Sequence, residues 1–334
     1  MLAIVCPGQG SQTPGFLTPW LELPAFRARL ESLSDVAEVD LVAHGTTSDA
    51  ETIKDTAVAQ PLIVGAGLAV AAVLLPDGPS GPVGVTGGHS VGEITAAAFA
   101  GVLDDRDAMV FVRERGRGMA AASATTPTGM SAVLGGDPAE VAAALERHGL
   151  TAANANGAGQ VVAAGTLEQL AALAAEPPAK ARVIPLQVAG AFHTSHMAPA
   201  VDALSSLSAG FKTRDPAVTL LSNADGAAVS GGADALARLV RQVSNPVRWD
   251  QCMQTMVSMG VTTLIELAPA GTLVGLAKRA MPGVATLAVK TPDDLEKAQQ
   301  LIAESGSARD GDPASVTPPS TPSSTPSSSD AQEA

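Results

Sequence analysis

The chain has 334 residues, of which 46% are hydrophobic and only 2% aromatic, with no tyrosine. This length suits one large domain, or a domain with a smaller insert, whose core is packed mainly by Ala, Val and Leu. The net charge of −13 argues against nonspecific nucleic-acid binding, because phosphate contacts need clustered lysine and arginine. An acidic partner would have to dock on a local basic patch.

The two cysteines, Cys6 and Cys252, lie in no metal-ligand spacing, and no metal site is predicted. Free buried thiols are expected, which is typical of a reducing compartment. The segment 1–7 has no basic region, and its apolar run is too short for a signal peptide. No apolar run approaches the ~20 residues that a membrane span needs. These features predict a cytoplasmic protein with no membrane partner.

A buried first strand is predicted at residues 2–6, followed by the glycine-rich loop Pro7-Gly8-Gln9-Gly10-Ser11-Gln12. The loop lacks the patterns of dinucleotide and P-loop sites, so the alternative is close approach of its backbone to a reacting group. Short amphipathic helical segments are expected within 20–43. A mostly buried helix is expected over 56–75, with a kink or a start at Pro61.

The strongest local pattern lies between Val83 and Glu93. An apolar strand ends in paired glycines, and Gly88-x-Ser90-x-Gly92 then leads into a helix-prone stretch. Strand, sharp turn and helix with a serine at the apex is the pattern of a nucleophile elbow. It would expose the serine hydroxyl above a helix N-terminus, where backbone N–H groups can stabilise an oxyanion. A glycine-rich turn with an incidental serine is the alternative.

A helix over 102–121 carries three alternating arginines near its end, Arg113, Arg115 and Arg117. Such a cluster fits a solvated helix C-terminus, where the helix dipole favours cations. Alternatively, one arginine turns inward to bind a carboxylate, which its planar fork suits. The local pattern favours the solvated interpretation.

The pattern of predicted helices and strands changes over 129–189. Strands are predicted at 130–134, 151–155, 160–164 and 181–188, helices at 138–148 and 167–175, and a hairpin turn at Asn156-Gly157. This β-α-β-β-α-β order is the ferredoxin-like pattern. We therefore predict an α/β fold with a hydrolase-like core and a mainly parallel sheet, formed by 1–128 and 190–303, that carries a ferredoxin-like insert at 129–189.

The second half of the core alternates between predicted helices and strands. The helices are expected at 200–208, 233–244, 246–259, 273–280 and 295–303, and the strands at 218–222, 263–266 and 285–289. Beyond these, Ser, Thr, Pro, Asp and Ala dominate. Because this composition cannot bury a core, 304–334 is predicted to be a disordered tail.

A serine nucleophile needs a base, because its hydroxyl is a very weak acid at neutral pH. Among five histidines, His193 and His196 are the candidates, since they follow the insert at a seam where clefts often form. His89 adjoins Ser90 in sequence but is expected to point away from it and to brace the turn.

The group that would orient this base has several candidates. In hydrolases with such an elbow an acid precedes the histidine, whereas Asp215 and Asp225 follow His193, and Glu168 and Glu176 lie in the insert. A backbone carbonyl or an amide is the alternative.

Seven short motifs follow one another along the chain: Pro7-Gly8-Gln9-Gly10-Ser11-Gln12, Gly88-His89-Ser90-Val91-Gly92-Glu93, Arg115-Gly116, Asn154-x-Asn156, Gly190-Ala191-Phe192-His193, Gln242-x-x-Asn245-Pro246-Val247-x-Trp249 and Glu266-Leu267-x-Pro269. In this order they resemble the motifs of malonyl-CoA:acyl-carrier-protein transacylases, particularly the actinobacterial ones, over about residues 1–303.

The resemblance implies an acyltransferase, an acyl-carrier-protein S-malonyltransferase. It would pass malonyl from malonyl-CoA to the phosphopantetheine thiol of acyl carrier protein, by a ping-pong route through malonyl-Ser90. This reaction would supply extender units for fatty-acid or polyketide synthesis. No cofactor is implied, since the CoA and phosphopantetheine thioesters are substrates, and we expect a monomer.

The resemblance also implies roles for individual residues. Ser90 would be the nucleophile and His193 its base, held by the main-chain carbonyl of Gln242, so that no carboxylate is required. The backbone N–H groups of Gln9 and Val91 would form the oxyanion hole.

Substrate recognition would fall to a second set of residues. Arg115 would pair with the free malonyl carboxylate, contrary to the solvated interpretation of its helix. Gln60, Asn156 and Phe192 would also bind substrate, and the sequence Ala191-Phe192-His193 favours malonyl over methylmalonyl. His196 departs from the commonest family pattern and is expected to be structural.

Two other classes of function compete with transfer. A serine hydrolase, such as an esterase or a patatin-like lipase, would need water at the acyl-serine and an Asp or Glu partner. A noncatalytic carrier-binding module would leave Ser90 unacylated. Residues that could form a basic patch for an acidic carrier are Lys212, Arg214, Arg248, Lys278 and Arg279.

Overall fold

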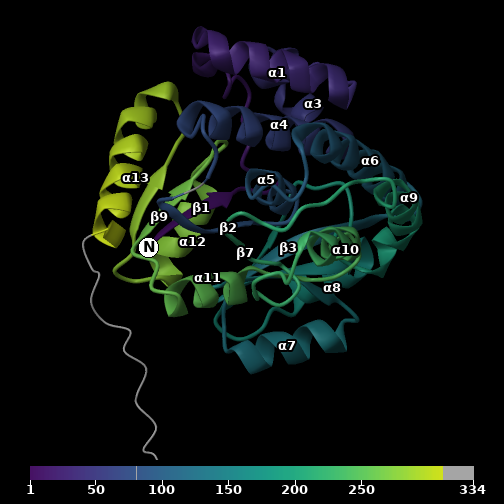
Figure 1. Ribbon diagram of the computed structural model, residues 1–334. Helices are drawn as coiled ribbons and strands as arrows, with labels where there is room; N and C mark the ends of the chain where they lie inside the picture. Colours follow the sequence, from purple (N-terminus) through teal and green to yellow (C-terminus); the bar gives the residue numbers. More distant parts are fainter. Residues whose placement is uncertain (80, 311–334) are drawn as a thin grey trace, which may run out of the picture.

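A parallel five-stranded sheet forms the centre of the molecule in the computed structural model, which describes residues 1–79 and 81–310 (Figure 1). We name it sheet A, and its strand order is β10-β9-β1-β2-β7. All four of its strand pairs are parallel. Its strands are β1 (Leu2–Cys6), β2 (Val83–Gly88), β7 (Thr219–Leu220), β9 (Thr263–Glu266) and β10 (Ala285–Ala288).

The helices around sheet A are α1 (Pro24–Ala37), α2 (Leu41–Thr46), α3 (Ala50–Lys54), α4 (Thr56–Leu74), α5 (Gly92–Phe99), α6 (Asp105–Ser123), α9 (Ala198–Ser208), α10 (Gly232–Gln242), α11 (Trp249–Ser258), α12 (Thr272–Ala280) and α13 (Leu295–Asp310). They lie on both sides of the sheet, and α1, α2 and α3 form an outer layer that packs on α4 (Figure 1). Short 3₁₀ turns occur at Pro19–Glu22, Ser195–Met197 and Pro292–Asp294.

Strand β1 shows why its sequence is apolar throughout. Leu2, Ile4 and Cys6 belong to the core beneath α4, α5 and α6, whereas Ala3 and Val5 pack in a second core with α11 and α12 (Figure 1). Side chains alternate between the two faces of a strand, so a strand covered on both sides must be apolar at every position.

Helix α4 is the central helix of the larger core. It begins at Thr56, where the Asp55 carboxylate accepts a hydrogen bond from the Ala57 N–H at 2.8 Å, and Pro61 therefore lies within the helix and not at its start. By length and composition α4 could cross a membrane, so the expectation that no apolar run is long enough is wrong. However, 78% of its most apolar window is buried inside the protein, as in the core helix of a globular domain.

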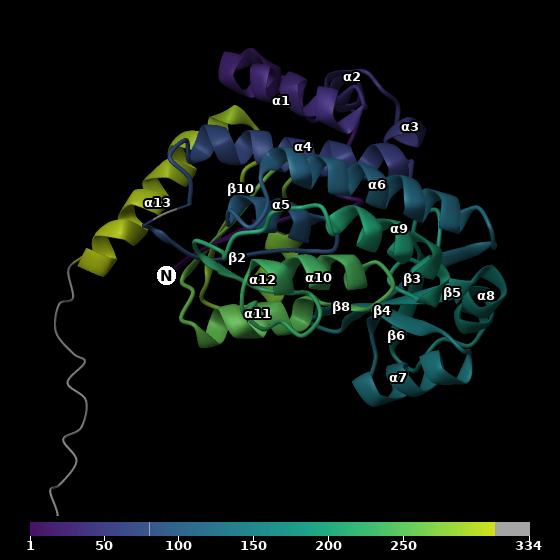
Figure 2. The same ribbon diagram turned by 45° about the vertical axis from the view of Figure 1, so that its right-hand side comes forward.

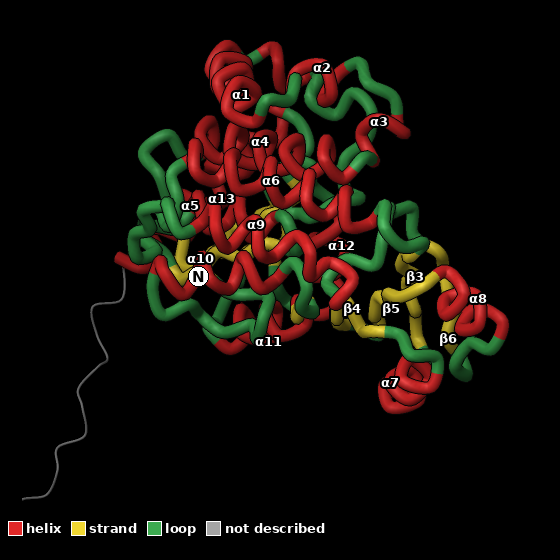
Figure 3. Tube along the Cα trace, turned by 90° about the vertical axis from the view of Figure 1, so that its right-hand side faces the viewer, coloured by secondary structure: helices red, strands yellow, loops and turns green. Residues whose placement is uncertain are grey.

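A second sheet, named sheet B, lies to one side with α7 (Pro138–Arg147) and α8 (Leu167–Ala175) packed on it (Figure 2, Figure 3). Its strand order is β6-β3-β5-β4-β8. The strands are β3 (Thr128–Gly135), β4 (Thr151–Gly157), β5 (Gln160–Thr166), β6 (Ala181–Pro185) and β8 (Val247–Arg248). The order along the chain, β3-α7-β4-β5-α8-β6, is the predicted ferredoxin-like one.

Two details of sheet B differ from expectation. The hairpin turn lies at Ala158-Gly159, both with positive φ, so Asn156-Gly157 belongs to strand β4. Strand β8 was expected to be part of a helix, yet it pairs in parallel with β4 and extends the sheet. A two-residue strand has no periodicity of its own, and only its neighbour defines it.

The predicted α/β class, with a mainly parallel sheet and a ferredoxin-like subdomain, is confirmed. We propose the division into a core of 1–128 and 190–303 and an insert of 129–189, with the qualification that β3 begins at Thr128 and β8 joins the two units. Residues 304–310 are helical and continue α13, so the tail does not start at 304; residues 311–334 lie outside the described part of the chain.

The turn between β2 and α5 leaves no room for side chains at its glycines. A Cβ on Gly88 would overlap the carbonyl of Gly92, and one on Gly92 would overlap the carbonyls of Cys6 and Pro7. The chain therefore needs glycine on both sides of Ser90 to bring strand, turn and helix this close.

We expect the substitution Gly88→Ala to destabilise the protein by about 4 kcal/mol or more, because the clash is with backbone that cannot move aside. Gly275→Ala is the matched control. Nothing lies within 4 Å of a Cβ built on Gly275 in α12, so alanine there should stabilise the protein by about 0.5–1 kcal/mol. Urea unfolding of both variants measures the difference, and equal stabilities would contradict the steric argument.

Candidate active site

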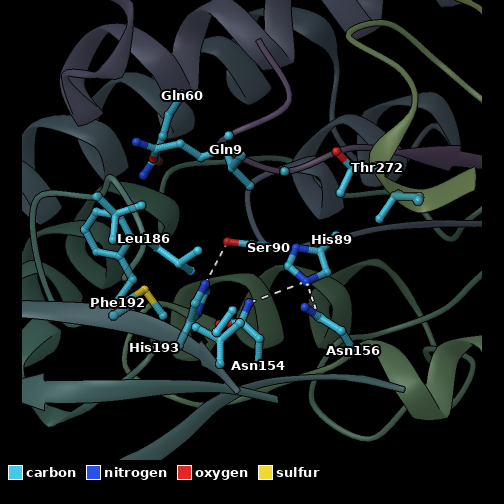
Figure 4. A pocket seen from close by; sticks show the side chains of 18 of the residues that line it. Gln9, Gln60, His89, Ser90, Asn154, Asn156, Leu186, Phe192, His193 and Thr272 are labelled. Carbon is cyan, nitrogen blue, oxygen red and sulfur yellow. Dashed lines mark hydrogen bonds between the residues drawn. The ribbon is translucent and has the colours of Figure 1, made fainter. Parts of the chain in front are cut away.

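Ser90 stands at the apex of the turn between β2 and α5, in a left-handed backbone conformation with φ of +53°. Its N–H donates to Asn223 Oδ1 at 2.8 Å, and its hydroxyl lies 2.7 Å from His193 Nε2 (Figure 4). Nonglycine residues adopt this conformation only where the surroundings enforce it, which is common at functional sites. The turn thus presents the hydroxyl to the imidazole.

His193 follows the insert and also has a positive φ, of +61°. Its Nδ1 lies 2.8 Å from the main-chain oxygen of Gln242. A carbonyl oxygen can only accept, so Nδ1 carries the proton and Nε2 is free to accept the hydrogen of Ser90. Burial, helped by the positive charge of Arg115, lowers the pKa of His193 to about 3. The imidazole is therefore neutral at physiological pH and able to act as a base.

This lowered pKa predicts a specific titration behaviour. Because protonation of His193 is disfavoured, its ring should keep the NMR shifts of neutral imidazole from pH 8 down to pH 5, well below the usual midpoint of about 6.5. A ring signal assigned through the His193→Gln variant and followed by pH titration tests this. A midpoint near 6.5 would contradict the buried, neutral histidine.

A cavity of about 250 Å³ opens beside the Ser90–His193 pair. Eight of the nine residues predicted for the site line it: Gln9, Gln60, Ser90, Val91, Arg115, Asn156, Phe192 and His193. The ninth, Gln242, contacts both His193 and Arg115. Figure 4 shows six of them, Gln9, Gln60, Ser90, Asn156, Phe192 and His193, around the cavity.

Arg115 points inward from α6 and is only 1% exposed. Its Nη1 donates to Gln60 Oε1 and its Nη2 to Gln242 Oε1, both at 2.7 Å, while its Nε has no partner among the described residues. Its neighbours Arg113 and Arg117 form surface ion pairs with Glu38. The interpretation of this cluster as a helix C-terminus is wrong, because α6 continues to Ser123 and has no basic residue in its last turn. Of the three arginines, Arg115 is the one that turns inward.

The two main-chain amides expected to bind an oxyanion lie on different segments. Gln9 follows β1 and Val91 precedes α5, and both line the cavity. Within residues 1–79 and 81–310, neither N–H has a hydrogen-bond acceptor. Two unused donors beside a nucleophile can stabilise negative charge on a reacting carbonyl.

His89 adjoins Ser90 but bonds elsewhere. Its Nε2 lies 2.9 Å from Asn156 Oδ1 and 3.4 Å from Asn154 Nδ2, on strand β4 (Figure 4). The histidine therefore ties the elbow to sheet B, as expected for a bracing residue. Asn156, predicted to bind substrate, lines the cavity but commits its amide oxygen to His89. His196 lies in a 3₁₀ turn, half-buried, and does not line the cavity.

None of the four candidate acids orients His193. The Asp225 carboxylate pairs with Arg238 at 2.8 Å, and that of Asp215 accepts from the Gly232 N–H at 3.1 Å. Glu168 and Glu176 are exposed on the insert. The main-chain oxygen of Gln242 takes the place of a carboxylate. In the described part of the chain, no group of three His, Cys, Asp or Glu side chains could hold a metal.

Two buried residues at the site received no role from the sequence. The side chain of Asn223 donates to the Gly88 carbonyl at 2.7 Å, and its backbone N–H donates to Glu93 at 3.0 Å. The Glu93 carboxylate lies 2.5 Å from Gln242 Nε2. The one available signal is that Glu93 is the only charged residue between Val83 and Leu103.

The comparisons with known proteins agree with this geometry. The model of the acyl transferase domain family matches residues 3–301. Malonyl CoA-acyl carrier protein transacylase of Mycobacterium tuberculosis is 51% identical over 307 residues, covering 90% of this chain and 100% of that protein. The Bacillus subtilis protein of the same name is 33% identical, covering 91% and 98%.

Solved structures give the same result. A crystal structure of the Mycobacterium tuberculosis enzyme has a TM-score of 0.85 at 50% identity, covering 90% of this chain and 99% of that one. A malonyl-transacylase solved in complex with a type II polyketide synthase acyl-carrier protein has a TM-score of 0.83 at 30% identity, covering 90% and 99%. Together with the family match over 3–301, these likenesses show that the chain belongs to the acyl transferase family, among the malonyl CoA-acyl carrier protein transacylases.

Proposed function

We propose that this acyltransferase moves the malonyl group from malonyl-CoA to the phosphopantetheine thiol of an acyl carrier protein, through a malonyl ester of Ser90. The observation that supports this proposal most directly is the series of contacts from Ser90 through His193 to the main-chain oxygen of Gln242. Ser90 and His193 line the same cavity as the buried Arg115. The names of the relatives support the choice of donor and acceptor.

The first half-reaction acylates the serine. His193 Nε2 takes the Ser90 proton while Oγ attacks the thioester carbonyl, and the Gln9 and Val91 amides bind the resulting oxyanion. Collapse of the tetrahedral intermediate breaks the carbon–sulfur bond, and CoA leaves with the proton from His193. The main-chain oxygen of Gln242 stabilises the imidazolium that forms between these two proton transfers.

The second half-reaction reverses the first with another thiol. His193 takes the proton of the carrier's phosphopantetheine thiol, the sulfur attacks the malonyl ester, and Ser90 regains its proton. One thioester replaces another, so the free-energy change is small. The proton lost by the carrier thiol equals the one gained by CoA, and Ser90 and His193 end in their starting protonation states.

Arg115 supplies selectivity for malonyl in this proposal. Its buried guanidinium lines the cavity, and its Nε–H has no acceptor among the described residues; a malonyl carboxylate would supply one. Acetyl has no such group, so an acetyl donor would leave this buried N–H without an acceptor. Gln60 and Gln242 hold the guanidinium plane from two other sides.

An acidic carrier needs a basic surface beside the mouth of the active-site cavity. Of the five basic candidates, Arg248 pairs with Asp250 at 2.9 Å and lines a different cavity. Arg279 instead reaches Gln160, a residue that lines the active-site cavity. We therefore favour the α12 side of the cavity, with Lys278 and Arg279, as the approach for an acidic carrier.

The geometry around His193 distinguishes transfer from the two competing classes, a serine hydrolase and a noncatalytic carrier-binding module. A hydrolase would use a carboxylate to orient its base, and His193 has a main-chain oxygen instead. A noncatalytic module has no need of a neutral imidazole 2.7 Å from an elbow serine. Both observations favour transfer.

Peptide mass spectrometry after brief mixing with malonyl-CoA, without carrier, tests the proposal. We expect a malonyl increment on the Ser90 peptide that disappears when carrier protein with its phosphopantetheine arm is added. CoA release with unmodified Ser90 would support hydrolysis, and no CoA release would refute malonyl-CoA as the donor.

A further inference from the structure

Glu93 is a buried carboxylate that the proposed reaction does not use. It lies in the first turn of α5, three residues after the nucleophile, and is 2% exposed. A carboxylate at this depth is costly unless several donors satisfy it. Its partners therefore indicate why it is there.

Three groups donate to the Glu93 carboxylate, one of them the Ser222 side chain. The backbone N–H of Asn223 donates to Oε1 at 3.0 Å, and Gln242 Nε2 donates to Oε2 at 2.5 Å. The N-terminal end of α5 adds a favourable dipole. Burial nevertheless raises the pKa of Glu93 to about 7, and the hydrogen bonds and the charge of Arg115 oppose this rise.

The orientation of the Gln242 amide follows from its surroundings. On one side, Nε2 faces three acceptors, namely Glu93 Oε2, Asn223 Oδ1 at 3.1 Å and the Ser90 carbonyl at 3.0 Å. On the other side, Oε1 faces the Arg115 guanidinium at 2.7 Å. The reversed amide would set an N–H against Arg115 and an oxygen against three acceptors, so only one orientation is satisfied.

Gln242 thus stands between a carboxylate and a guanidinium that do not touch. A direct Glu93–Arg115 pair would occupy N–H groups that a substrate carboxylate needs. With the amide between them, Glu93 balances the buried charge of Arg115 through space and through one polarised side chain. Among residues 1–79 and 81–310, the Arg115 Nε–H then has no acceptor.

We propose that Glu93 is a positioning residue for acyl-group selectivity: through the Gln242 amide it holds Arg115 in the orientation that receives a carboxylate on the acyl group. This inference rests on the proposed function of the site and assigns to it a residue that touches neither substrate nor the reacting atoms.

The substitution Glu93→Gln tests the inference with little change in shape. If Oε1 of the introduced glutamine keeps the hydrogen bond from the Asn223 N–H, its side-chain nitrogen faces Gln242 Nε2. Two donors then oppose each other. Gln242 must therefore rotate its amide, which removes the oxygen that contacts Arg115. We expect kcat/KM for malonyl-CoA to fall about 10- to 100-fold, as for loss of a hydrogen bond to a charged group. The value for acetyl-CoA should fall much less, because acetyl makes no use of Arg115.

Glu266→Gln is the matched control for removing a buried carboxylate. Glu266 accepts hydrogen bonds from Gly271, Leu273 and Val274 at the start of α12 and has no contact with Gln242. This control should lower the melting temperature without changing the malonyl-to-acetyl ratio. In an Arg115→Ala background, Glu93→Gln should also leave the ratio of malonyl-CoA to acetyl-CoA kcat/KM unchanged. The reason is that Glu93 acts on this ratio only through Arg115.

Two results would overturn the inference. One is an equal fall in kcat/KM for malonyl-CoA and acetyl-CoA in Glu93→Gln. The other is that Glu93→Gln changes the malonyl-to-acetyl ratio as much in the Arg115→Ala background as in the unchanged protein. A crystal structure of Glu93→Gln provides a readout without turnover. We expect the Arg115 Nη2–Gln242 Oε1 contact to be lost, and its retention would also overturn the inference. Absence of a malonyl adduct in the unchanged protein would instead count against the proposed function, which keeps the two failures apart.

Discussion

The Ser90→Ala variant is expected to lose acyl transfer by about 10⁴- to 10⁶-fold, the scale seen when a nucleophilic serine is removed from a Ser–His relay. In this chain the loss should be close to complete, because the hydroxyl 2.7 Å from His193 Nε2 is the atom that would carry the malonyl group. The rate at which the carrier protein gains a malonyl group from malonyl-CoA, followed by mass spectrometry of the intact carrier, measures the transfer.

The same preparation should lose the malonyl increment on the peptide that contains position 90. Ser258→Ala is a suitable control, since Ser258 is exposed at the end of α11, its hydroxyl donates to the Thr255 carbonyl, and it does not line the cavity. It should retain full activity. Transfer at an undiminished rate by Ser90→Ala would refute the covalent mechanism as a whole.

The Arg115→Ala variant is expected to lower kcat/KM for malonyl-CoA by about 10²- to 10³-fold and to affect acetyl-CoA far less. A buried arginine–carboxylate pair combines charge with several hydrogen bonds, and truncating one partner of such a pair costs about 3–5 kcal/mol. For acetyl-CoA the guanidinium provides no favourable contact, so its removal costs little. Parallel measurement of both donors gives the ratio.

Arg117→Ala is the matched control for Arg115→Ala. Arg117 lies two residues further along α6, and its side chain is 46% exposed in a surface pair with Glu38. Surface pairs contribute about 0–1 kcal/mol, so both donors should react at nearly unchanged rates. An equal fall in kcat/KM for malonyl-CoA and acetyl-CoA in Arg115→Ala, after correction for the folded fraction, would refute the assignment of Arg115 to the malonyl carboxylate.

Local sequence patterns were sufficient for the features that depend on chain geometry alone. The elbow is one, because a serine flanked by glycines between an apolar strand and a helix can form only a tight turn. The ferredoxin-like order of 129–189 is another, since helical and strand periodicities differ clearly there. Both are contained in stretches of contiguous residues.

Features that depend on distant residues could not be worked out in this way. From residue patterns alone, the arginine cluster of α6 suggested a solvated helix end, yet Arg115 is buried because Gln60 and Gln242 lie opposite its side of the helix. Only the resemblance to a family pointed to that role. Strand β8 was missed for a similar reason, since it exists only by pairing with β4.

The sequence by itself determined the nucleophile turn, the α/β class and the presence of histidines after the insert, because these follow from local sterics and hydrophobic periodicity. Residue patterns alone did not decide which groups serve the serine; the family resemblance implied them, and the tertiary structure places them in contact. The orienting acceptor of His193 is a main-chain oxygen 49 residues away, and every residue type carries such an atom, so no side-chain pattern can mark it. Glu93 owes its position to Gln242 and Asn223, which reach it only when α10 and the loop after β7 pack against α5.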